Sequence, residues 1–276
     1  MGAPVLSFDL TARVAVITGG AGLLGGMHGE AIATLGGIPV LVDLDESAAQ
    51  KRADAIADTF GVKALGVACN ITDDGAVEAL RDRVLAKFGR VDILINNAAN
   101  NPKVERGISG ANFSRMEDFP IEQWNQDLAV GLTGAFLCSR AFGVTMATQG
   151  KGVIINIASQ YGLVAPNQGL YRVNGRPEDQ QPVKSVTYPV VKAGIIGLTR
   201  YLATYWPGKV RANTLAPGGV FAGQPEEFLL RYAALVPMAR MGNPDEFQGA
   251  IAFLASDASS YVTGATLVVD GGLTCW

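Results

Sequence analysis

The chain has 276 residues, of which 49% are hydrophobic and 17% are charged, and its formal net charge is −3. This length suits one α/β domain, and the slight negative charge argues against a nucleic-acid-binding surface. One histidine and three widely spaced cysteines exclude a histidine-rich metal site and a disulfide framework, so no metal is expected. The start lacks a basic segment followed by a long apolar one, and no apolar run reaches membrane-spanning length. We therefore expect a cytoplasmic protein without a membrane partner.

Short, almost continuous apolar runs alternate with amphipathic stretches along the chain. An uninterrupted apolar run is typical of a strand buried on both faces, whereas apolar residues three or four positions apart, as in 45–61, indicate a helix. The predicted strands are 14–18, 38–43, 64–69, 91–96, 152–159, 210–217 and 265–271. This alternation predicts an α/β fold, a single-domain Rossmann-type doubly wound parallel sheet with helices on both faces, spanning 1–276.

Two long segments, 160–187 and 220–243, interrupt the alternation. Long connections inside a compact domain are usually functional. Each of these follows the carboxyl end of a strand, which is where an open parallel sheet binds its ligands. We expect the first to be an insertion and the second a lid, both over an active site.

The first strand runs into a glycine-rich turn with Gly19, Gly22 and Gly25, and then into a helix. Glycines let the backbone turn tightly beside a pyrophosphate, and the free N–H groups at the helix start favour its charge. A plain turn also uses glycine, but the place between first strand and first helix favours a dinucleotide site.

Asp43 ends the second strand. Its carboxylate would accept hydrogen bonds from the adenosine ribose and repel a 2′-phosphate, so we expect NAD, with NADP the less favoured cofactor. The alternative is that Asp43 only caps the next helix.

Seven short motifs occur in the order that they have in the short-chain dehydrogenase/reductase family, which the chain resembles over essentially its whole length. They are TGGAGLLG (18–25), CNITD (69–73), NNAA (96–99), INIAS (155–159), Tyr188-x-x-x-Lys192, APGG (216–219) and YVTGATLVVDGG (261–272). The resemblance implies a nicotinamide cofactor and the interconversion of an alcohol and a carbonyl compound.

Tyr188, Lys192 and Ser159 are the candidate catalytic residues. A lysine four residues after a tyrosine lies on the same helix face, and its ammonium favours the phenolate form of a group that is otherwise a poor base at neutral pH. A surface pair has the same spacing. The resemblance implies that Tyr188 exchanges the hydroxyl proton, that Lys192 also binds the nicotinamide ribose, and that Ser159 holds the reacting oxygen.

The resemblance also implies the cofactor contacts. Leu24 would offer a backbone N–H to the phosphates, and the other positions would flank the adenine, line the cofactor or cradle the nicotinamide. The full predicted set is Gly19, Gly22, Leu24, Asp43, Asn70, Ile71, Asn97, Ala98, Ala99, Tyr188, Lys192, Pro217, Gly218 and Val220.

Two positions depart from the family pattern. Leu23 stands where the middle glycine of the loop is usual, and Gly131 stands where a fourth catalytic asparagine is expected. In the family this asparagine stabilises a helix bend and a water in a proton relay. Gly131 therefore leaves room for a non-catalytic NAD-binding protein.

The interval between Ser159 and Tyr188 is much longer than the family usually has. The added residues include several polar ones: Asn167, Tyr171, Arg172, Asn174 and Arg176. This composition suits a hydroxylated or phosphorylated substrate. A solvated loop or an oligomer contact is the alternative.

The insertion and its flanking segments resemble the family branch connected with flagellin modification and nucleotide-sugar synthesis. We therefore expect an NAD-dependent oxidoreductase that interconverts a secondary alcohol and a ketone on a sugar or nucleotide sugar. A reductase of small ketones or acyl chains is the alternative enzyme. The apolar run 263–276 and the predicted helix 188–206 resemble surfaces through which the family pairs, so a homodimer or homotetramer is expected.

Overall fold

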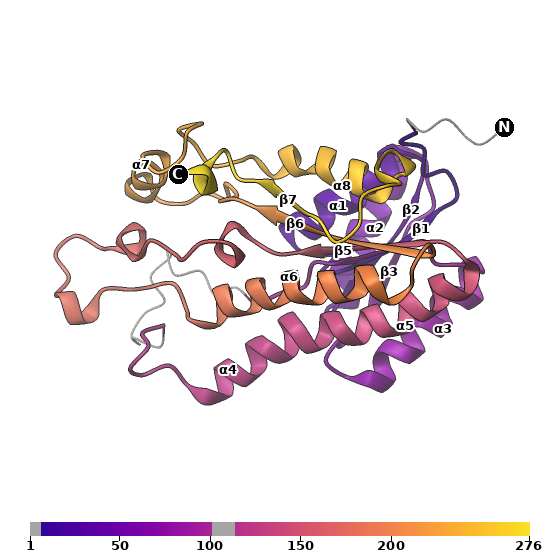
Figure 1. Ribbon diagram of the computed structural model, residues 1–276, viewed down its shortest axis with the longest axis horizontal. Coiled ribbons are helices and arrows are strands. Elements are labelled where there is room, and N and C mark those ends of the chain that lie inside the picture. Colours follow the sequence, from indigo (N-terminus) through magenta and orange to yellow (C-terminus); the bar gives the residue numbers. More distant parts are fainter. Residues whose placement is uncertain (1–6, 101–113) are drawn as a thin grey trace.

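The computed structural model describes residues 7–100 and 114–276. Its strands form one seven-stranded sheet in the order β3-β2-β1-β4-β5-β6-β7, in which every neighbouring pair is parallel (Figure 1). The strands are β1 (Val14–Thr18), β2 (Ile38–Asp43), β3 (Leu65–Ala68), β4 (Ile93–Asn96), β5 (Gly152–Ile157), β6 (Val210–Pro217) and β7 (Thr266–Val269). All seven lie where the sequence predicts them, although β3, β4, β5 and β7 are shorter.

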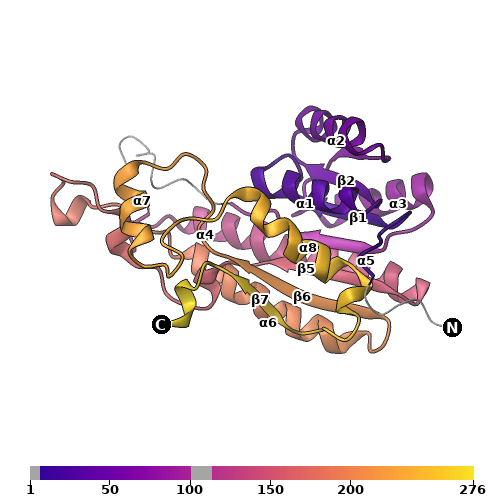
Figure 2. The ribbon, with the colours of Figure 1, turned by 90° about the horizontal axis from the view of Figure 1, so that it is seen from above.

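Helices cover both faces of the sheet, as predicted (Figures 1 and 2). One face carries α1, α2 and α8, and the other carries α3, α5 and α6. The helices are α1 (Leu23–Thr34), α2 (Glu46–Phe60), α3 (Asp74–Phe88), α4 (Ile121–Leu128), α5 (Gly134–Gln149), α6 (Thr187–Tyr205), α7 (Glu226–Ala233) and α8 (Gln248–Ala255). The fold is therefore a Rossmann-type α/β fold.

Strand β1 shows why its sequence is apolar throughout. Val14 and Val16 belong to the apolar core on the side of α3 and α5, whereas Ala15 and Ile17 belong to the core on the side of α1 and α2. Successive side chains of a strand point to opposite faces. Because both faces are covered, none of these positions is exposed to water.

Helix α2 follows the rules for helix ends. The Asp45 side chain accepts a hydrogen bond from the N–H of Ala48, and Gly61 ends the helix in the left-handed region with φ +66°. The capping residue is thus Asp45. Asp43 does not cap this helix, so that alternative is wrong.

One helical stretch, Ile121–Gln149, contains α4 and α5. It differs from the expectation that no apolar run reaches membrane-spanning length. By length and composition alone it could cross a membrane. Half of its most apolar 18-residue part is buried inside the protein. Leu137, Phe142 and Met146 of α5 pack in the core against the sheet. This stretch is therefore accounted for as a core helix.

The segments 160–187 and 220–243 lie together at one end of the molecule, and the second of them contains α7 (Figures 1 and 2). Three 3-10 turns and irregular backbone form the first segment, and α7 lies in the second. Six of their buried apolar side chains form one group, here called the outer cluster: Leu170, Tyr171, Phe228, Tyr232, Val236 and Met241. The two interruptions in the sequence pattern are thus one packed unit.

Candidate active site

The glycine loop between β1 and α1 packs too closely for side chains. Gly19 has φ +64°, and a Cβ there would lie 3.0 Å from Ala98 Cα. A Cβ on Gly25 would lie 2.1 Å from the carbonyl oxygen of Gly19. Gly22 precedes α1 without a side-chain cap, so the N–H groups of the first turn, including that of Leu24, have no intrahelical acceptor. These N–H groups form an anion-binding position.

Three polar side chains fix this loop. Asn97 donates from Nδ2 to the carbonyl oxygen of Thr18 at 2.9 Å, and the Thr18 hydroxyl accepts from the N–H groups of Asn97 and Ala98 at 3.0 and 3.1 Å. Asp43 accepts from the N–H of Ala21 at 3.0 Å and from that of Leu44 at 2.8 Å. The carboxylate of Asp43 therefore lies beside the loop, at the end of β2.

Asn70 and Ile71 follow β3 and differ in exposure. Asn70 is exposed, and its side-chain oxygen accepts from the N–H and the hydroxyl of Thr72 at 3.1 and 2.8 Å. Ile71 is 8% exposed and packs into the core, close to Gly134. Any contact of Ile71 with a ligand is therefore left to its backbone.

Tyr188 and Lys192 lie in the first two turns of α6. The helix begins at Thr187, so the missing N–H of Pro189 falls among those without an intrahelical acceptor. Lys192 is 5% exposed, and its Nζ donates to the carbonyl oxygen of Ile157 at 2.8 Å. The same Nζ lies 5.7 Å from the centroid of the Tyr188 ring. Lys192 is thus buried and Tyr188 half-buried at the site, so the predicted pair is not an exposed surface pair.

Burial changes the ionisation of Lys192. Removal from water is the larger cause and the positive charge of Lys184 is the smaller one. Together they lower the pKa of Lys192 to about 8. Lys192 is therefore still mostly protonated at neutral pH, but it loses its charge far below the range of an exposed lysine.

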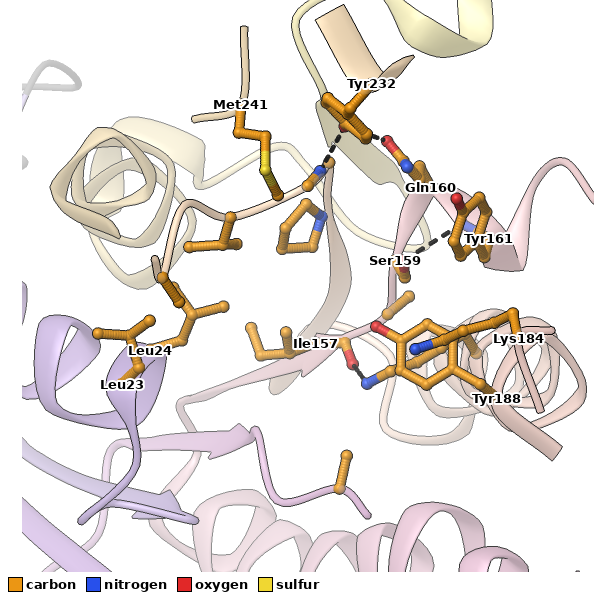
Figure 3. A pocket seen from close by; sticks show the side chains of 18 of the residues that line it. Leu23, Leu24, Ile157, Ser159, Gln160, Tyr161, Lys184, Tyr188, Tyr232 and Met241 are labelled. Carbon is orange, nitrogen blue, oxygen red and sulfur yellow. Dashed lines mark hydrogen bonds between the residues drawn. The ribbon is translucent and has the colours of Figure 1, made fainter. Parts of the chain in front are cut away.

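A cavity of about 440 Å³ lies at the carboxyl ends of β5 and β6 (Figure 3). Nine predicted residues line it: Leu24, Asn97, Ala99, Ser159, Tyr188, Lys192, Pro217, Gly218 and Val220. The other predicted residues, Gly19, Gly22, Asp43, Asn70, Ile71 and Ala98, are outside its lining and lie at or after the ends of β1 to β4. The structure thus brings the three candidate catalytic residues into one cavity with part of the glycine loop.

Ser159 follows the end of β5 and is 6% exposed. Its hydroxyl oxygen accepts from the N–H of Tyr161 at 3.2 Å. Since a serine hydroxyl has one donor and two acceptor positions, its own proton is not used by this bond. Ser159 can therefore donate to an oxygen in the cavity.

A chain of buried polar side chains ties α6 to the sheet. Asn96 donates to the side-chain oxygen of Asn156 at 2.8 Å, Asn156 donates to the Thr199 hydroxyl at 2.8 Å, and the hydroxyls of Thr199 and Thr214 are 2.7 Å apart. Thr199 lies on α6, whereas the others lie on β4, β5 and β6. This connection, which the sequence analysis did not foresee, fixes the helix that carries Tyr188.

Gly131 lies in a single π-helical turn, Ala129–Thr133, between α4 and α5. The helix is thus locally irregular at this position without an asparagine side chain. A Cβ on Gly131 would lie 2.3 Å from Cγ1 of Val191. The side chain of Val191 therefore occupies the space where an asparagine would start.

The polar residues of the insertion mostly stay outside the cavity. Arg172, Asn174 and Arg176 are exposed, and Arg172 forms an ion pair with Glu178. Asn174 bonds to Glu227 on α7 at 3.1 Å. Of the polar residues singled out from the sequence of this insertion, only Tyr171 lines the cavity. The solvated-loop alternative therefore fits Arg172, Asn174 and Arg176, whereas Tyr171 lines the cavity.

Other polar side chains line the cavity instead (Figure 3). Tyr232 accepts from the N–H of Gly219 at 2.6 Å and donates to Gln160 at 3.2 Å, which fastens α7 over the loop after β6. Gln160, Tyr161, Lys184 and Gln224 also line the cavity. Sequence reasoning missed these residues. The sequence did contain a signal for Lys184. Lys184 lies four residues before Tyr188, and Lys192 lies four residues after it.

The comparisons with known proteins agree with this geometry. Residues 13–171 match the family model described as short chain dehydrogenase, and residues 179–274 match the model described as Enoyl-(Acyl carrier protein) reductase. D-threitol dehydrogenase of Mycolicibacterium smegmatis is 35% identical over 276 residues, which cover 97% of this chain and 95% of that protein. Cis-4-hydroxycyclohexanecarboxylate dehydrogenase of Sinomonas cyclohexanicum is 35% identical over 268 residues, which cover 95% and 96%.

A solved structure extends the likeness to three dimensions. The gluconate 5-dehydrogenase of Burkholderia cenocepacia, in complex with NADP and tartrate, superposes with a TM-score of 0.85 at 29% identity and covers 99% of both chains. Together with the family match over more than half of the sequence, these findings settle the classification. The chain belongs to the short-chain dehydrogenase/reductase family and is an NAD(P)-dependent oxidoreductase that acts on CH–OH groups.

Proposed function

We propose that this protein interconverts a secondary alcohol and a ketone on a polyhydroxylated substrate, a sugar or a sugar derivative, and that it prefers NAD. The observation that carries the proposal is the single cavity that Ser159, Tyr188 and Lys192 share with Leu24 of the glycine loop and Pro217 of β6. A proton-transfer group and a dinucleotide position thus face the same space.

The chain's own residues divide the proton chemistry between them. Tyr188 takes the hydroxyl proton during oxidation and returns it during reduction. Ser159 holds the reacting oxygen with the hydroxyl proton that its bond to Tyr161 leaves available. Lys192, fixed by Ile157, places positive charge near the tyrosine and keeps further donors for ribose hydroxyls.

The residues present fit NAD(P). The loop at Gly19 and Gly25 leaves no room for side chains, the start of α1 offers N–H groups for a diphosphate, and Asp43 stands where ribose hydroxyls would bind. When bound, the nicotinamide accepts or donates the hydride. The preference for NAD is a proposal that rests on the carboxylate of Asp43, which would repel a 2′-phosphate.

The proposed substrate class rests on the cavity and on the relatives. Gln160, Tyr161 and Gln224 supply polar groups in the lining, which suits hydroxylated molecules. Threitol is a polyol and gluconate is a sugar acid, and these are substrates named for relatives of similar length. A nucleotide sugar is the narrower form of the proposal, drawn from the resemblance to the flagellin-modification branch.

Specific observations favour the alternative enzyme. Leu23, Phe228 and Met241 add apolar lining, and one matching family model is described as Enoyl-(Acyl carrier protein) reductase. Both observations favour small ketones or acyl chains. The non-catalytic NAD-binding protein, an alternative drawn from Gly131, is not supported, because the chain belongs to a family of oxidoreductases and resembles dehydrogenases over essentially its whole length.

A substrate panel tests the proposal. Purified protein is mixed with NAD or NADP and with polyols, sugar acids or nucleotide sugars, and NADH or NADPH formation is followed by absorbance. Oxidation of a polyol or sugar derivative with NAD is the expected result. Consumption of NADH or NADPH with only simple ketones or acyl thioesters, measured in the reducing direction, would favour the alternative enzyme. Cofactor binding without turnover of any polyol or sugar derivative would contradict the proposed substrate class.

We also propose a homo-oligomer, a dimer or tetramer, built from one domain over 1–276 and located in the cytoplasm. The exposed Tyr201 and Tyr205 of α6 and the exposed Val268 of β7 support the assembly, since they leave apolar surface open on the elements that the resemblance singles out. Light scattering at micromolar concentration should give twice or four times the mass of the chain. A monomer would contradict this part of the proposal.

A further inference from the structure

Lys184 is a second buried cation beside Tyr188. It is 8% exposed, and its Nζ lies 4.0 Å from the centroid of the Tyr188 ring, closer than the 5.7 Å of Lys192. Figure 3 shows the side chain of Lys184 crossing in front of the ring. The catalytic tyrosine of this chain is thus approached by two lysines from two segments.

The insertion holds Lys184 in this place. The backbone N–H of Lys184 donates to the side-chain oxygen of Gln168 at 2.8 Å. Gln168 begins the 3-10 turn Gln168–Tyr171, whose Leu170 and Tyr171 are buried in the outer cluster. A segment packed against α7 therefore positions the ammonium.

The charged and titratable groups facing Tyr188 come from four segments, among the residues that the structure describes. Lys192 follows it on α6 and Lys184 precedes it. Tyr161 contacts its ring edge-on at a centroid distance of 6.4 Å. Asp127 of α4 lines a small cavity together with Tyr188 and Lys192 and bonds to Thr187 and Gln123. The carboxylate of Asp127 opposes ionisation of the phenol, whereas both ammonium groups favour it.

We propose that Lys184 stabilises the phenolate form of Tyr188 and so acts as a positioning residue for proton transfer, alongside Lys192. A cation over an aromatic face is attracted by the ring, and the attraction increases when the ring carries the negative charge of a phenolate. This inference rests on the proposed role of Tyr188 in the reaction.

The ionisation of Lys192 supports this assignment. Burial first, and Lys184 second, lower the pKa of Lys192 to about 8. At higher pH Lys192 is mostly neutral, so it then contributes less positive charge to a phenolate. The ring therefore faces two lysine side chains, and Lys184 is the nearer of them, 4.0 Å from the centroid.

The test measures the ionisation of Tyr188 without any substrate. Phenolate absorbance in the ultraviolet is titrated for the wild type and for Lys184→Met, Lys184→Gln and Lys184→Arg, and each curve is corrected with the same protein carrying Tyr188→Phe. We expect Tyr188 to ionise about one pH unit or more higher in the Met and Gln variants, and close to the wild-type pH in the Arg variant. Circular dichroism identifies any variant that does not fold.

A matched control uses another lysine over an aromatic ring. Lys87 lies 5.9 Å from the centroid of the Phe88 ring and is exposed, away from the cavity. Lys87→Met should leave the titration of Tyr188 unchanged. If folded Lys184→Met and Lys184→Gln also leave it unchanged, Lys184 has no effect on the phenol and the inference is wrong.

Kinetics separate this inference from the proposed function. With a substrate from the panel, the pH dependence of kcat for alcohol oxidation should move in parallel with the titration, whereas KM changes little. A rise in KM for sugar acids only, with an unchanged titration, would make Lys184 a substrate anchor and overturn the inference. A shifted titration with no active substrate in the panel would support the inference and count against the proposed function.

Discussion

The glycine loop and the substrate end of the cavity differ in how the chain builds them. The loop is formed by neighbours in sequence, from Gly19 to Gly25, and presents backbone N–H groups. The substrate end combines side chains from three distant segments: Ser159 after β5, Lys184 in the insertion and Tyr232 on α7. The first works through backbone N–H groups and the second through side chains that packing brings together, so substitutions in the two regions should fail in different ways.

The largest effect is expected at the substrate end, where Tyr188→Phe removes only a hydroxyl. Turnover should fall by at least ~10²-fold, the lower range for a lost general acid–base group, whereas NAD affinity and fold are retained. Steady-state kinetics and a cofactor titration measure both quantities.

Tyr171→Phe is the matched control, because Tyr171 also lines the cavity but packs in the outer cluster, with its ring 5.8 Å from that of Phe228. Its turnover should stay within a few-fold of the wild type. Loss of activity in Tyr171→Phe with full activity in Tyr188→Phe would reverse the assignment.

Gly131→Asn tests whether packing has replaced the family's asparagine. The new Cβ would meet Val191, so the free energy of unfolding should fall by about 1–3 kcal/mol. Adding Val191→Ala should recover part of this loss. Urea denaturation measures each variant.

Gly197→Asn on α6 is the control for Gly131→Asn, since nothing lies within 4 Å of a Cβ there. It should change stability little. A Gly131→Asn protein as stable as this control would show that the space beside Val191 is open after all.

In the glycine-loop region, the single histidine should make the free energy of unfolding depend on pH under acidic conditions. His28 of α1 is fully buried, and burial lowers its pKa to about 3, so the folded protein binds this proton less readily than the unfolded chain. Stability should therefore fall as pH drops from the usual imidazole range toward 3. The share from His28 is about 2 kcal/mol between about pH 6.5 and 5.

Denaturation of the wild type and of His28→Leu across this pH range measures that share. Because His28 is the only histidine, the difference between the two slopes isolates it. Equal slopes for the two proteins would mean that His28 is protonated equally well in both states.

The smallest of these effects concerns cofactor choice. Asp43→Ala combined with Leu44→Arg removes a carboxylate and adds a cation at an exposed position, so the ratio of NADP to NAD affinity should rise by about tenfold. Asp45→Ala, which removes the cap of α2, should leave this ratio unchanged. Binding titrations measure both. Tighter binding of NADP than of NAD by the wild type would contradict the proposed preference.

The sequence by itself determined the order of the strands along the chain, the glycine loop and the Tyr188/Lys192 pair. These features follow from local rules: uninterrupted apolar runs, glycines at close backbone approaches, and the helical interval of four residues. They could be predicted because each leaves a recognisable pattern in residues that are neighbours in sequence.

Only the tertiary structure decided what surrounds Tyr188. It placed Lys184 over the ring, put Val191 in the space beside Gly131, and kept Arg172 outside the cavity although its segment was expected to face a substrate. Each of these results depends on contacts between segments far apart in sequence, and no local pattern encodes which of several polar side chains such packing turns inward.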